Sequence, residues 1–412
     1  MPVAGGLCQP ESASIREHLL TFSRYDGAML RVLTLATLFP DATRPNFGVF
    51  VERQTLGLAA YAEVDLRLVA PIGLPPWPLT RHPRYRALAG LPRHEMWKGL
   101  DTLRPRFLTV PGTGGRRHVA ALVRALVPVI DALREEFPFD VIDAEFFFPD
   151  GPAAIALGQR YGVPVSIKAR GADIHHWGHG PTGRQVVAAG HGAAGMLAVS
   201  EAMKRDMAAL GLPAENIRVH RTGVDLDRFA PLDRPTAKSA LGVTGPLVVA
   251  VGALIERKGH AIVIEAMRGV PDATLLIAGD GPERGRLDAL IARLGLTDRV
   301  RLLGAVPHAD LPRLIAAADV SALASSSEGL ANAWVESLAC GTPVVITDAG
   351  GARELVRDAA AGRVVARTAP AFAAAIKEVL AHPPSPEETR RSALPFTWEA
   401  NTAALYAHLA GL

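Results

Sequence analysis

Short apolar runs rich in β-branched residues alternate with longer amphipathic stretches along most of the chain. This alternation is typical of parallel βαβ units, in which each strand is followed by a helix that returns across the sheet. In the first half, buried strands are predicted at 29–36, 64–70, 107–110, 139–143, 163–168 and 196–199. Helices are predicted at 48–63, at 116–136 and from about 151. Some five or six strands of this kind indicate one doubly wound α/β domain.

The alternation lapses in two places. Residues 71–105 are rich in proline, which fixes φ and removes a backbone donor, so no long regular element is expected there. Residues 221–245 are rich in Asp, Pro and Gly and form a candidate interdomain linker. A second series of strands follows, at 247–251, 273–278, 300–303, 320–323 and 344–346, and a last helix is predicted at 398–409.

The length of 412 residues exceeds what one hydrophobic core usually organises. We therefore predict an N-terminal extension at 1–27, a first Rossmann-like domain at 28–225 and a second at 240–395. The two domains would face each other across a cleft. In open parallel sheets the ligand lies beyond the carboxyl ends of the strands, so the loops at those ends are the candidate site.

Composition and charge exclude several classes of protein. An apolar fraction of 49% and a charged fraction of 21% rule out disorder, and a net charge of +3 favours mild attraction to phosphates over nucleic-acid binding. Cys8 and Cys340 are too few and too far apart for a disulfide framework or a cysteine-based zinc site. Because neither a signal-peptide core nor a run of about eighteen apolar residues occurs, we expect a cytoplasmic protein.

The stretch from Ser325 to Glu336 follows a predicted strand and opens a predicted helix. Backbone N–H groups near Gly329–Ala331 would be free at the start of that helix and would form an anion site. Glu328 precedes this site and Glu336 follows it, and a carboxylate on each side suits the hydroxyl groups of a sugar diphosphate. In the alternative interpretation Glu328 caps the helix and Glu336 is a solvated surface residue.

Two adjacent cations, Arg257 and Lys258, lie in a predicted strand-to-helix loop where they can face phosphate oxygens. The spacing of a Walker A loop is absent, and the alternative is a solvated start of a helix. Histidines 175, 176 and 179 invite a metal site, but adjacent histidines do not easily present one face and no carboxylate accompanies them at a ligand spacing, so no metal is expected.

Several motifs together resemble family 4 of the retaining nucleotide-sugar glycosyltransferases. They are Gly252 with Lys258-Gly259, Gly279-Asp-Gly-Pro282, Glu328 with Glu336, Ala339-Cys-Gly-Thr-Pro343 and Gly350-Gly351, in the family's order and at its intervals. The resemblance covers about residues 30–410 and implies the GT-B fold, with the acceptor in the first domain and the nucleotide sugar in the second. It also implies that a terminal helix at 396–412 packs back on the first domain.

The resemblance also implies roles for individual residues. Glu336 would hold the ribose, Glu328 would contact the donor sugar, and Lys258 with Arg257 would neutralise the diphosphate without a metal ion or other cofactor. The turn near Leu302 would lie beside the base. The remaining donor-binding candidates are Gly48, Arg170, Asp173, Gly252, Gly329, Leu330, Ala331 and Asn332.

The first half resembles a branch that acts on bacterial surface polysaccharides such as teichuronic acid. Asn46-Phe-Gly-Val-Phe-Val-Glu52 fits its first loop and helix, where Gly48 would let the backbone approach the donor. Many members carry histidine where this chain has Glu145 and where it has Arg170, and the common arginine after the first motif glycine is Ala253. Glu145 is either a catalytic residue or a loop carboxylate paired with Arg170.

The reaction expected from this resemblance is transfer of a sugar, with retention, from a UDP- or GDP-sugar to a glycan or lipid-linked acceptor. Its barrier lies in loss of the diphosphate, so cations and a helix N-terminus would supply the catalysis. Basic and aromatic residues interleave between Trp77 and Lys98, which suits an anionic inner membrane surface or a lipid-linked acceptor. The alternative is an ordered loop that packs its own aromatic side chains.

Three rival functions use the same two-domain arrangement. A sugar-nucleotide epimerase would need further acids in the cleft. A phosphorylase would need a pyridoxal-binding lysine in the second domain, where Lys258 and Lys377 are the only lysines. A non-catalytic scaffold would not need Glu328, Glu336 and Lys258. The sequence alone leaves the base, the sugar and the acceptor open.

Overall fold

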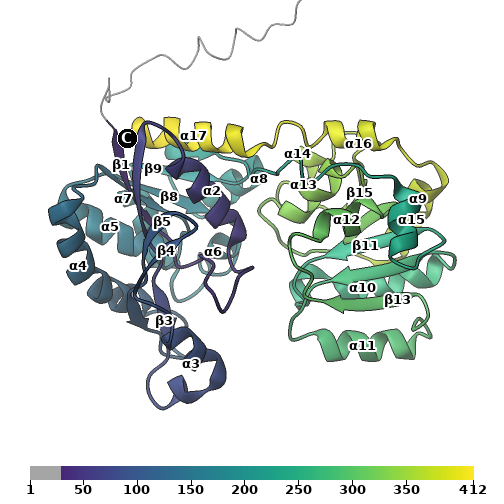
Figure 1. Ribbon diagram of the computed structural model, residues 1–412, viewed down its shortest axis with the longest axis horizontal. Coiled ribbons are helices and arrows are strands. Elements are labelled where there is room, and N and C mark those ends of the chain that lie inside the picture. Colours follow the sequence, from purple (N-terminus) through teal and green to yellow (C-terminus); the bar gives the residue numbers. More distant parts are fainter. Residues whose placement is uncertain (1–28) are drawn as a thin grey trace, which may run out of the picture.

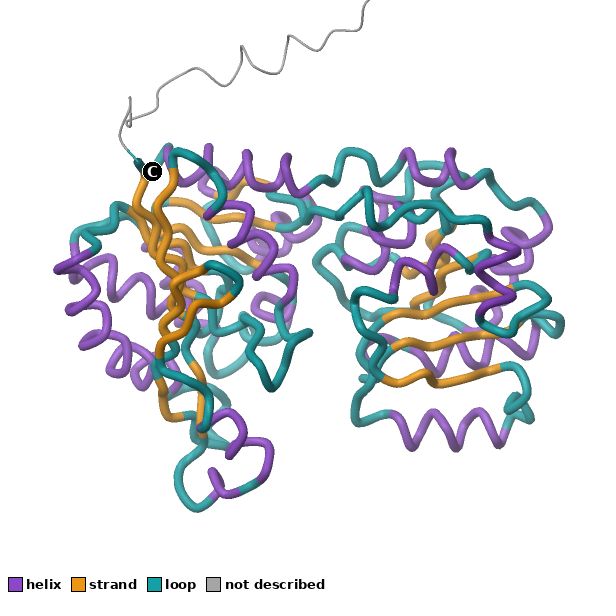
Figure 2. Tube along the Cα trace, viewed as in Figure 1, coloured by secondary structure: helices purple, strands orange, loops and turns teal. Residues whose placement is uncertain are grey.

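The computed structural model describes residues 29–412, so the predicted N-terminal extension at 1–27 lies outside the described residues. Two α/β domains lie side by side and are joined along one edge, where the last helix extends from the second domain over the first (Figure 1). Each domain has a central sheet with helices packed on its faces (Figure 2). The two Rossmann-like domains predicted from the sequence are confirmed.

The first domain contains an eight-stranded sheet of order β10-β9-β8-β7-β1-β2-β5-β4, in which only the β4–β5 pair is antiparallel. Its strands are β1 (Leu30–Leu35), β2 (Val64–Val69), β4 (His94–Trp97), β5 (Leu100–Leu103), β7 (Val141–Ala144), β8 (Val165–Ala169), β9 (Gly195–Ala198) and β10 (Ile217–Val219). Its helices are α2 (Val49–Ala59), α3 (Pro83–Ala89), α4 (His118–Glu136), α5 (Asp150–Tyr161), α6 (Ala172–His175), α7 (Gly183–Gly192) and α8 (Glu201–Ala209). Most of these strands were predicted because they are buried on both faces and therefore appear in the sequence as continuous apolar runs.

The proline-rich segment folds into short elements, as its composition predicts. β3 (Ile72–Leu74) pairs with β6 (Arg106–Leu108) in a separate two-stranded sheet, so the apolar run predicted at 107–110 does not join the main sheet. A 3₁₀ turn, η1 (Leu79–Arg81), and α3 complete a small projection with its own apolar cluster, which we call the insertion lobe (residues 72–91). It extends away from the main sheet at the bottom of Figure 1.

The second domain has a fully parallel six-stranded sheet of order β13-β12-β11-β14-β15-β16. Its strands are β11 (Leu247–Val251), β12 (Thr274–Ala278), β13 (Val300–Gly304), β14 (Val320–Leu323), β15 (Val344–Thr347) and β16 (Gly362–Val365). Its helices are α9 (Arg234–Ala240), α10 (His260–Ala266), α11 (Arg284–Arg293), α12 (Leu311–Ala316), α13 (Asn332–Ala339), α14 (Ala352–Leu355), α15 (Ala369–Ala381) and α16 (Pro386–Arg391). Helix α9 packs on α12, so part of the predicted linker belongs to this domain.

The chain crosses between the domains twice, and the two crossings lie together. Val224 on the first crossing donates its backbone N–H to the carbonyl of Phe396 on the second, at 2.8 Å. Helix α17 (Trp398–Ala410) then packs on α2, and its Leu405 and Leu409 belong to the apolar core of the first domain. The predicted return of residues 396–412 to the first domain is therefore observed.

Within residues 29–412, no helix combines the length and apolar character needed to cross a bilayer.

Candidate active site between the two domains

A pocket of about 460 Å³ lies between the domains, at the carboxyl ends of β11, β12 and β13. Helix α2 contributes one wall and the start of α13 another. The residues that line the pocket are Asn46, Val49, Phe50, Arg53, Gly223, Val251, Gly252, Ala253, Ala278, Gly279, Asp280, Ala305, Val306, His308, Leu311, Asn332, Glu336 and Trp398. The position agrees with the rule that parallel sheets bind ligands beyond the carboxyl ends of their strands.

Glycines let the pocket walls come together. Gly279 has φ 158°, and a Cβ there would lie 1.9 Å from the carbonyl oxygen of Gly252, so the loops after β11 and β12 come this close because Gly279 has no side chain. Gly48, at the start of α2, has φ 77°, and a Cβ there would lie 2.5 Å from the carbonyl oxygen of Leu38. Its neighbours Asn46 and Val49 line the pocket, so Gly48 lies beside the pocket.

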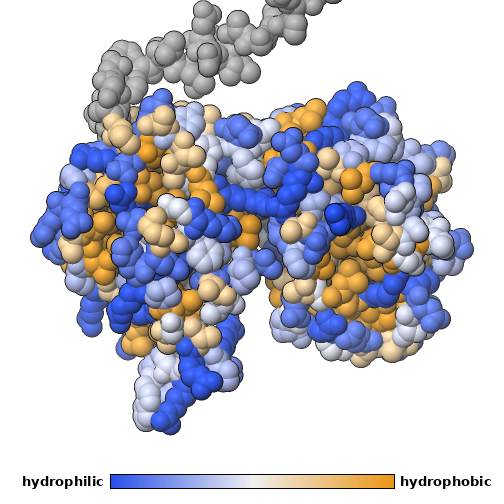
Figure 3. Space-filling view, in the orientation of Figure 1, coloured by the Kyte–Doolittle hydropathy of each residue, from blue (hydrophilic) through white to orange (hydrophobic). Residues whose placement is uncertain are grey.

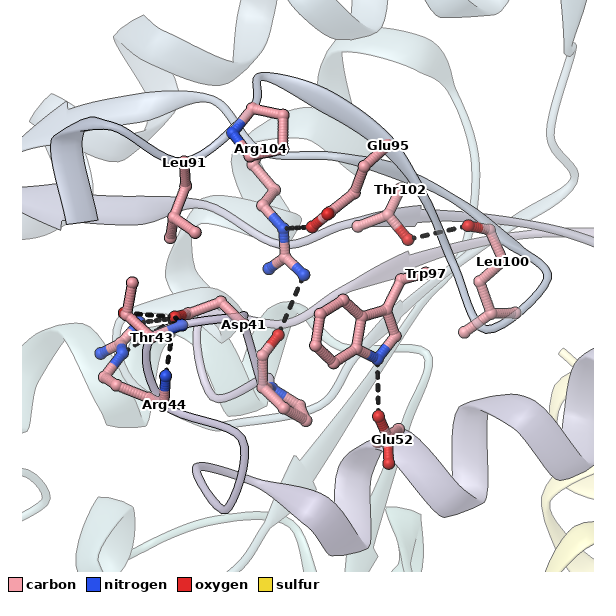
Figure 4. Close-up of polar contacts among 12 residues, drawn as sticks. Asp41, Thr43, Arg44, Glu52, Leu91, Glu95, Trp97, Leu100, Thr102 and Arg104 are labelled. Atoms are coloured by element: carbon pink, nitrogen blue, oxygen red, sulfur yellow. Dashed lines mark hydrogen bonds and ion pairs between the residues drawn. The ribbon is translucent and has the colours of Figure 1, made fainter. Parts of the chain in front are cut away.

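The loop before α2 is held in place by buried charges (Figure 4). The Asp41 carboxylate accepts hydrogen bonds from the backbone N–H groups of Thr43 and Arg44, at 2.9 and 3.0 Å. Burial opposes ionisation of Asp41, but these bonds and the Arg44 guanidinium lower its pKa. Arg104, also buried, pairs with Glu95 on β4 and donates to the carbonyl of Pro40 at 2.9 Å. These contacts fix the approach of the chain to the pocket-lining face of α2.

Glu328 forms ion pairs with Lys258 and Arg257, the two cations that the sequence assigned to the diphosphate. Lys258 Nζ is 2.6 Å from Glu328 Oε1, and Arg257 Nη1 is 3.4 Å from Glu328 Oε2 and also donates to the carbonyl of Ser327. The Lys258 chain runs beside Gly252, where a Cβ would lie 3.7 Å from Lys258 Cδ, so this group borders the pocket. The carboxylate is an internal partner for both cations, and an incoming diphosphate would compete with it.

Neither alternative interpretation of the two glutamates agrees with the structure. Helix α13 begins at Asn332, and its N-cap, Ala331, receives no side-chain hydrogen bond, so Glu328 does not cap it. Glu336 is 8% exposed and lines the pocket, so it is not a solvated surface residue. The start of α13 reaches the pocket through Asn332, and no side chain caps the N–H groups there.

The loop before α13 contacts the first domain. Gly351 N donates to the carbonyl of Gly329 at 2.8 Å, and a Cβ on Gly329 would lie 2.8 Å from the carbonyl oxygen of Arg170. The predicted donor-binding residues Leu330 and Ala331 are buried, and Gly329 lies where the two domains meet. Glycine at 329 is therefore required by the close approach of the two backbones.

Glu145 and Arg170 form the pair that the sequence left as an alternative. Glu145 is fully buried, pairs with Arg170, accepts a hydrogen bond from Gln54 and lies 3.7 Å from Lys168 Nζ. Burial and the charge of Glu145 raise the pKa of Asp143, while for Glu145 itself burial is outweighed by Lys168 and Arg170, which lower its pKa. Of the two acids, Asp143 is therefore the first to take up a proton as the pH falls.

The buried Asp173 carboxylate stabilises the loop that carries Arg170 through backbone hydrogen bonds. The carboxylate accepts backbone N–H groups of Phe147, Arg170 and Gly171 at 2.7 to 3.0 Å, and burial raises its pKa against these bonds. Arg170 lies over the ring of Phe50, with 4.9 Å from Cζ to the ring centroid. Because Phe50 lines the pocket and Arg170 does not, Arg170 and Asp173 lie one layer behind the pocket wall.

Leu302 does not line the pocket. Its side chain packs against the core of the second domain, and the residues that reach the pocket after β13 are Ala305, Val306 and His308. Sequence reasoning also missed Phe50, Arg53 and Trp398. The helical spacing of Val49, Phe50 and Arg53, which lie on one face of α2, was the available signal for two of these.

Within the described residues no group of three or more His, Cys, Asp or Glu side chains could hold a metal ion. His175, one of the histidines considered for metal binding, contacts Ser327 and Asp206 instead.

Comparisons with known proteins identify the family and agree with the fold. Residues 86–228 match the family model described as Glycosyltransferase Family 4, and residues 233–394 match the model described as Glycosyl transferases group 1. The chain is a family 4 glycosyltransferase of the GT-B fold. The junction between the two matched regions lies in the linker, so each model covers most of one structural domain.

Relatives of this glycosyltransferase include enzymes of polysaccharide and sugar-phosphate synthesis. It is 28% identical over 340 residues to TuaC of Bacillus subtilis (strain 168), a glycosyltransferase assigned to teichuronic acid biosynthesis, covering 79% of this chain and 83% of that one. It is 37% identical over 212 residues to D-inositol 3-phosphate glycosyltransferase of Mycobacterium bovis (strain BCG / Pasteur 1173P2), covering 48% of this chain and 44% of that one.

Solved structures share the whole fold. Sucrose-phosphate synthase from Thermosynechococcus elongatus superposes with a TM-score of 0.76 at 21% identity, covering 92% of this chain and 97% of that chain. HepE of Anabaena in complex with UDP-glucose superposes with a TM-score of 0.71 at 21% identity, covering 93% and 100%.

Proposed function

We propose that this glycosyltransferase moves a sugar, with retention, from a nucleoside diphosphate sugar to a glycan or lipid-linked acceptor in bacterial polysaccharide biosynthesis. One observation carries the proposal: the pocket between the domains has the Glu336 carboxylate on its wall and is bordered by the Lys258–Arg257–Glu328 group. A carboxylate suits ribose hydroxyls and two cations suit a diphosphate, so the pocket matches a nucleoside diphosphate in polarity. HepE, which shares the fold, binds UDP and UDP-glucose.

The charges of the chain would take the place of a metal ion in this reaction. As the diphosphate oxygens bind Lys258 and Arg257, Glu328 would exchange its ion pairs for the hydroxyls of the donor sugar. The backbone N–H groups between Gly329 and Asn332 would add dipoles without a side-chain cap to compete with them.

Bond changes in the proposed step balance within donor and acceptor. The bond between the anomeric carbon and the diphosphate oxygen breaks, and negative charge builds on the departing diphosphate. The acceptor oxygen bonds to the anomeric carbon on the same face, and its proton passes to a leaving phosphate oxygen. Glu145 is buried and paired, so we assign it the role of holding Arg170 behind Phe50 and not that of a nucleophile.

The acceptor side of the proposal rests on the insertion lobe. The segment between Trp77 and Lys98 divides into two parts: Trp97 Nε1 and Lys98 Nζ bind Glu52 at 2.6 and 2.9 Å, which ties β4 to α2. Trp77, by contrast, is 72% exposed, with Arg81 over its ring at 5.5 Å. The surface of the lobe carries hydrophilic residues at its tip (Figure 3). We propose that the lobe contacts the anionic inner leaflet and brings a cytoplasmic enzyme to a lipid-linked acceptor.

A panel of UDP-, GDP- and ADP-sugars tests the proposed function. We expect one donor to release its nucleoside diphosphate, slowly with water and faster with an acceptor glycan, and the product linkage to have the anomeric configuration of the donor. Conversion of the donor sugar without nucleotide release would show an epimerase. Binding of no donor at all would contradict the assignment of the pocket.

A further inference from the structure

The carboxylate assigned to the ribose is itself held by a histidine. His308 Nε2 lies 3.0 Å from Glu336 Oε1, and both residues line the pocket. Glu336 Oε2 makes no hydrogen bond within residues 29–412 and is left for a ligand. Because a carboxylate on a flexible side chain binds hydroxyls best when its orientation is set beforehand, the partner of Oε1 matters to the ligand of Oε2.

Two arginines determine which nitrogen of His308 carries the proton. Arg53 Nη2 lies 3.2 Å from His308 Nδ1, and Arg228 Nη2 also donates to Nδ1 and to the His308 carbonyl. A guanidinium has only donors, so Nδ1 must accept and the proton of the neutral ring lies on Nε2. Nε2–H is then the donor that Glu336 Oε1 accepts.

The imidazole has little freedom to turn away. Phe229 packs against it edge to face, with ring centroids 5.4 Å apart and an interplanar angle of 72°. The side chain of His308 is 23% exposed and that of Glu336 11%. A ring clamped by an aromatic side chain and two guanidinium groups presents Nε2–H in one direction.

The three elements that hold this arrangement come from different parts of the fold. Arg53 lies on α2 of the first domain, Arg228 on the segment between the domains, and His308 and Glu336 in the second domain. Burial and the neighbouring Arg228 lower the pKa of Arg53, as expected for a guanidinium that reaches out of its own domain into a charged contact. The orientation of His308 therefore depends on the two domains being together.

We infer that His308 is a positioning residue that orients Glu336 toward the ribose of the donor, and that Arg53 makes this orientation dependent on domain closure. The inference rests on the proposed function, because the ribose is part of the nucleoside diphosphate assigned to the pocket. It connects helix α2 of the first domain to the recognition of the nucleotide. Arg53 donates to Nδ1 of His308, Nε2–H of His308 donates to Glu336, and Glu336 would accept the hydroxyl groups of the ribose.

The experiment compares a ribonucleotide with its 2′-deoxy counterpart. Titration calorimetry gives the dissociation constants of UDP, 2′-deoxy-UDP, GDP and 2′-deoxy-GDP for the full chain. A hydroxyl bound by an oriented carboxylate should make the preferred ribonucleotide bind about tenfold to a hundredfold more tightly than its deoxy counterpart. We expect His308→Ala, Arg53→Ala and Glu336→Ala each to lose most of this preference.

Two further variants separate positioning from a general structural effect. His308→Gln keeps a donor at the place of Nε2 and an acceptor for the arginines, so it should restore most of the preference. His308→Ala combined with Glu336→Ala should be no weaker than Glu336→Ala alone, because His308 acts through Glu336. His382→Ala, at an exposed histidine of the second domain, is the matched control, and circular dichroism confirms folding of each variant.

The outcomes distinguish the positioning role of His308 from the proposed function. If the wild type prefers the ribonucleotide and His308→Ala keeps the full preference, the positioning role is overturned while the proposed function stands. If His308→Gln fails as completely as His308→Ala although both are folded, the role of the Nε2–H donor is overturned. If the wild type binds none of the four nucleotides, the proposed function fails first.

Discussion

His175 of the first domain and Ser327 of the second lie in direct contact, with 2.6 Å between the imidazole Nδ1 and the serine Oγ. The other ring nitrogen lies 2.9 Å from the carboxylate of Asp206 on α8. Nearby, the Glu354 carboxylate accepts the backbone N–H groups of Glu201 and Ala202, at 3.1 and 2.9 Å, at the positive end of α8. The first domain therefore directly contacts the loop that carries Glu328.

Loss of the His175 contact should affect turnover more than nucleotide affinity. Ser327 directly precedes Glu328, so His175→Ala should let the loop that carries Glu328 move while leaving the pocket around Glu336 intact. We expect kcat to fall by about tenfold to a hundredfold, with little change in the dissociation constant of the nucleoside diphosphate. His176→Ala, at the exposed neighbour, is the control, and equal losses in both variants would contradict the prediction.

The two glutamates of the site should respond differently to removal. Glu336→Ala should weaken nucleoside diphosphate binding by about 1–3 kcal/mol if a buried hydrogen bond to ribose is lost. Glu328→Ala should lower turnover but leave this binding unchanged or tighter, because Glu328 competes with the diphosphate for Lys258 and Arg257. Calorimetry measures the nucleotide affinity of both variants, and steady-state kinetics measures their turnover. Wild-type nucleotide affinity in Glu336→Ala would show that the ribose lies elsewhere.

Activity should survive an excess of chelator, since two cations and the start of α13 are proposed to neutralise the diphosphate. Lys258→Ala should lower turnover by about 10²-fold or more. Lys377→Ala removes the same charge from an exposed position of the second domain and should have no effect. The arrangement would be wrong if chelator abolished activity and magnesium or manganese restored it.

The insertion lobe should bind anionic vesicles in a salt-dependent way. Each cation near the surface contributes at most about 1 kcal/mol, so sedimentation with vesicles of phosphatidylglycerol should occur at low salt and reverse at high salt. Replacing Arg81, Arg84 and Arg86 of the lobe, and Arg93 just after it, with serine should abolish this binding without changing nucleotide affinity. The matched control replaces four exposed arginines of the second domain, Arg268, Arg293, Arg301 and Arg313. Wild-type protein that ignores such vesicles would contradict membrane contact.

A buried histidine should make the docking of α17 sensitive to acid. His408 lies on the buried face of α17, with its Nε2 3.0 Å from Ser166 Oγ on β8, and burial lowers its pKa to about 3. The unfolded chain, with a histidine pKa of about 6.5, therefore binds more protons below that pH, and stability falls as the pH falls. At pH 5.5 the loss from this residue should be about 1.4 kcal/mol.

Urea unfolding of the wild type and of His408→Gln between pH 8 and pH 5 measures this loss as the difference between the two curves. Taking the difference removes the opposite contribution of Asp150, whose pKa burial raises to about 7. His191→Gln, at an exposed histidine, controls for the substitution itself. Parallel curves for wild type and His408→Gln would show that His408 does not carry the acid sensitivity.

Much of the fold could be predicted because its strands are buried on both faces. Such strands appear as continuous apolar runs, and the intervals between them were long enough for a crossover helix. The short edge strands β10 and β16 and the antiparallel β4–β5 pair were missed, because the few residues of an edge strand, most of them partly or fully exposed, form no continuous apolar run. Proline content alone predicted short elements in the insertion but not that β5 would join the main sheet.

Some residues of the candidate site could likewise be predicted from the sequence, and others could not. Lys258, Glu328 and Glu336 follow strands of the second domain within motifs of fixed spacing, so the sequence by itself determined that they meet at one edge of one sheet. Arg53 and His308 lie 255 positions apart and belong to no common motif. Only the packing of the two domains brings a guanidinium of α2 to the imidazole beside Glu336, since contacts between separate domains depend on how whole surfaces fit and leave no periodic pattern in the chain.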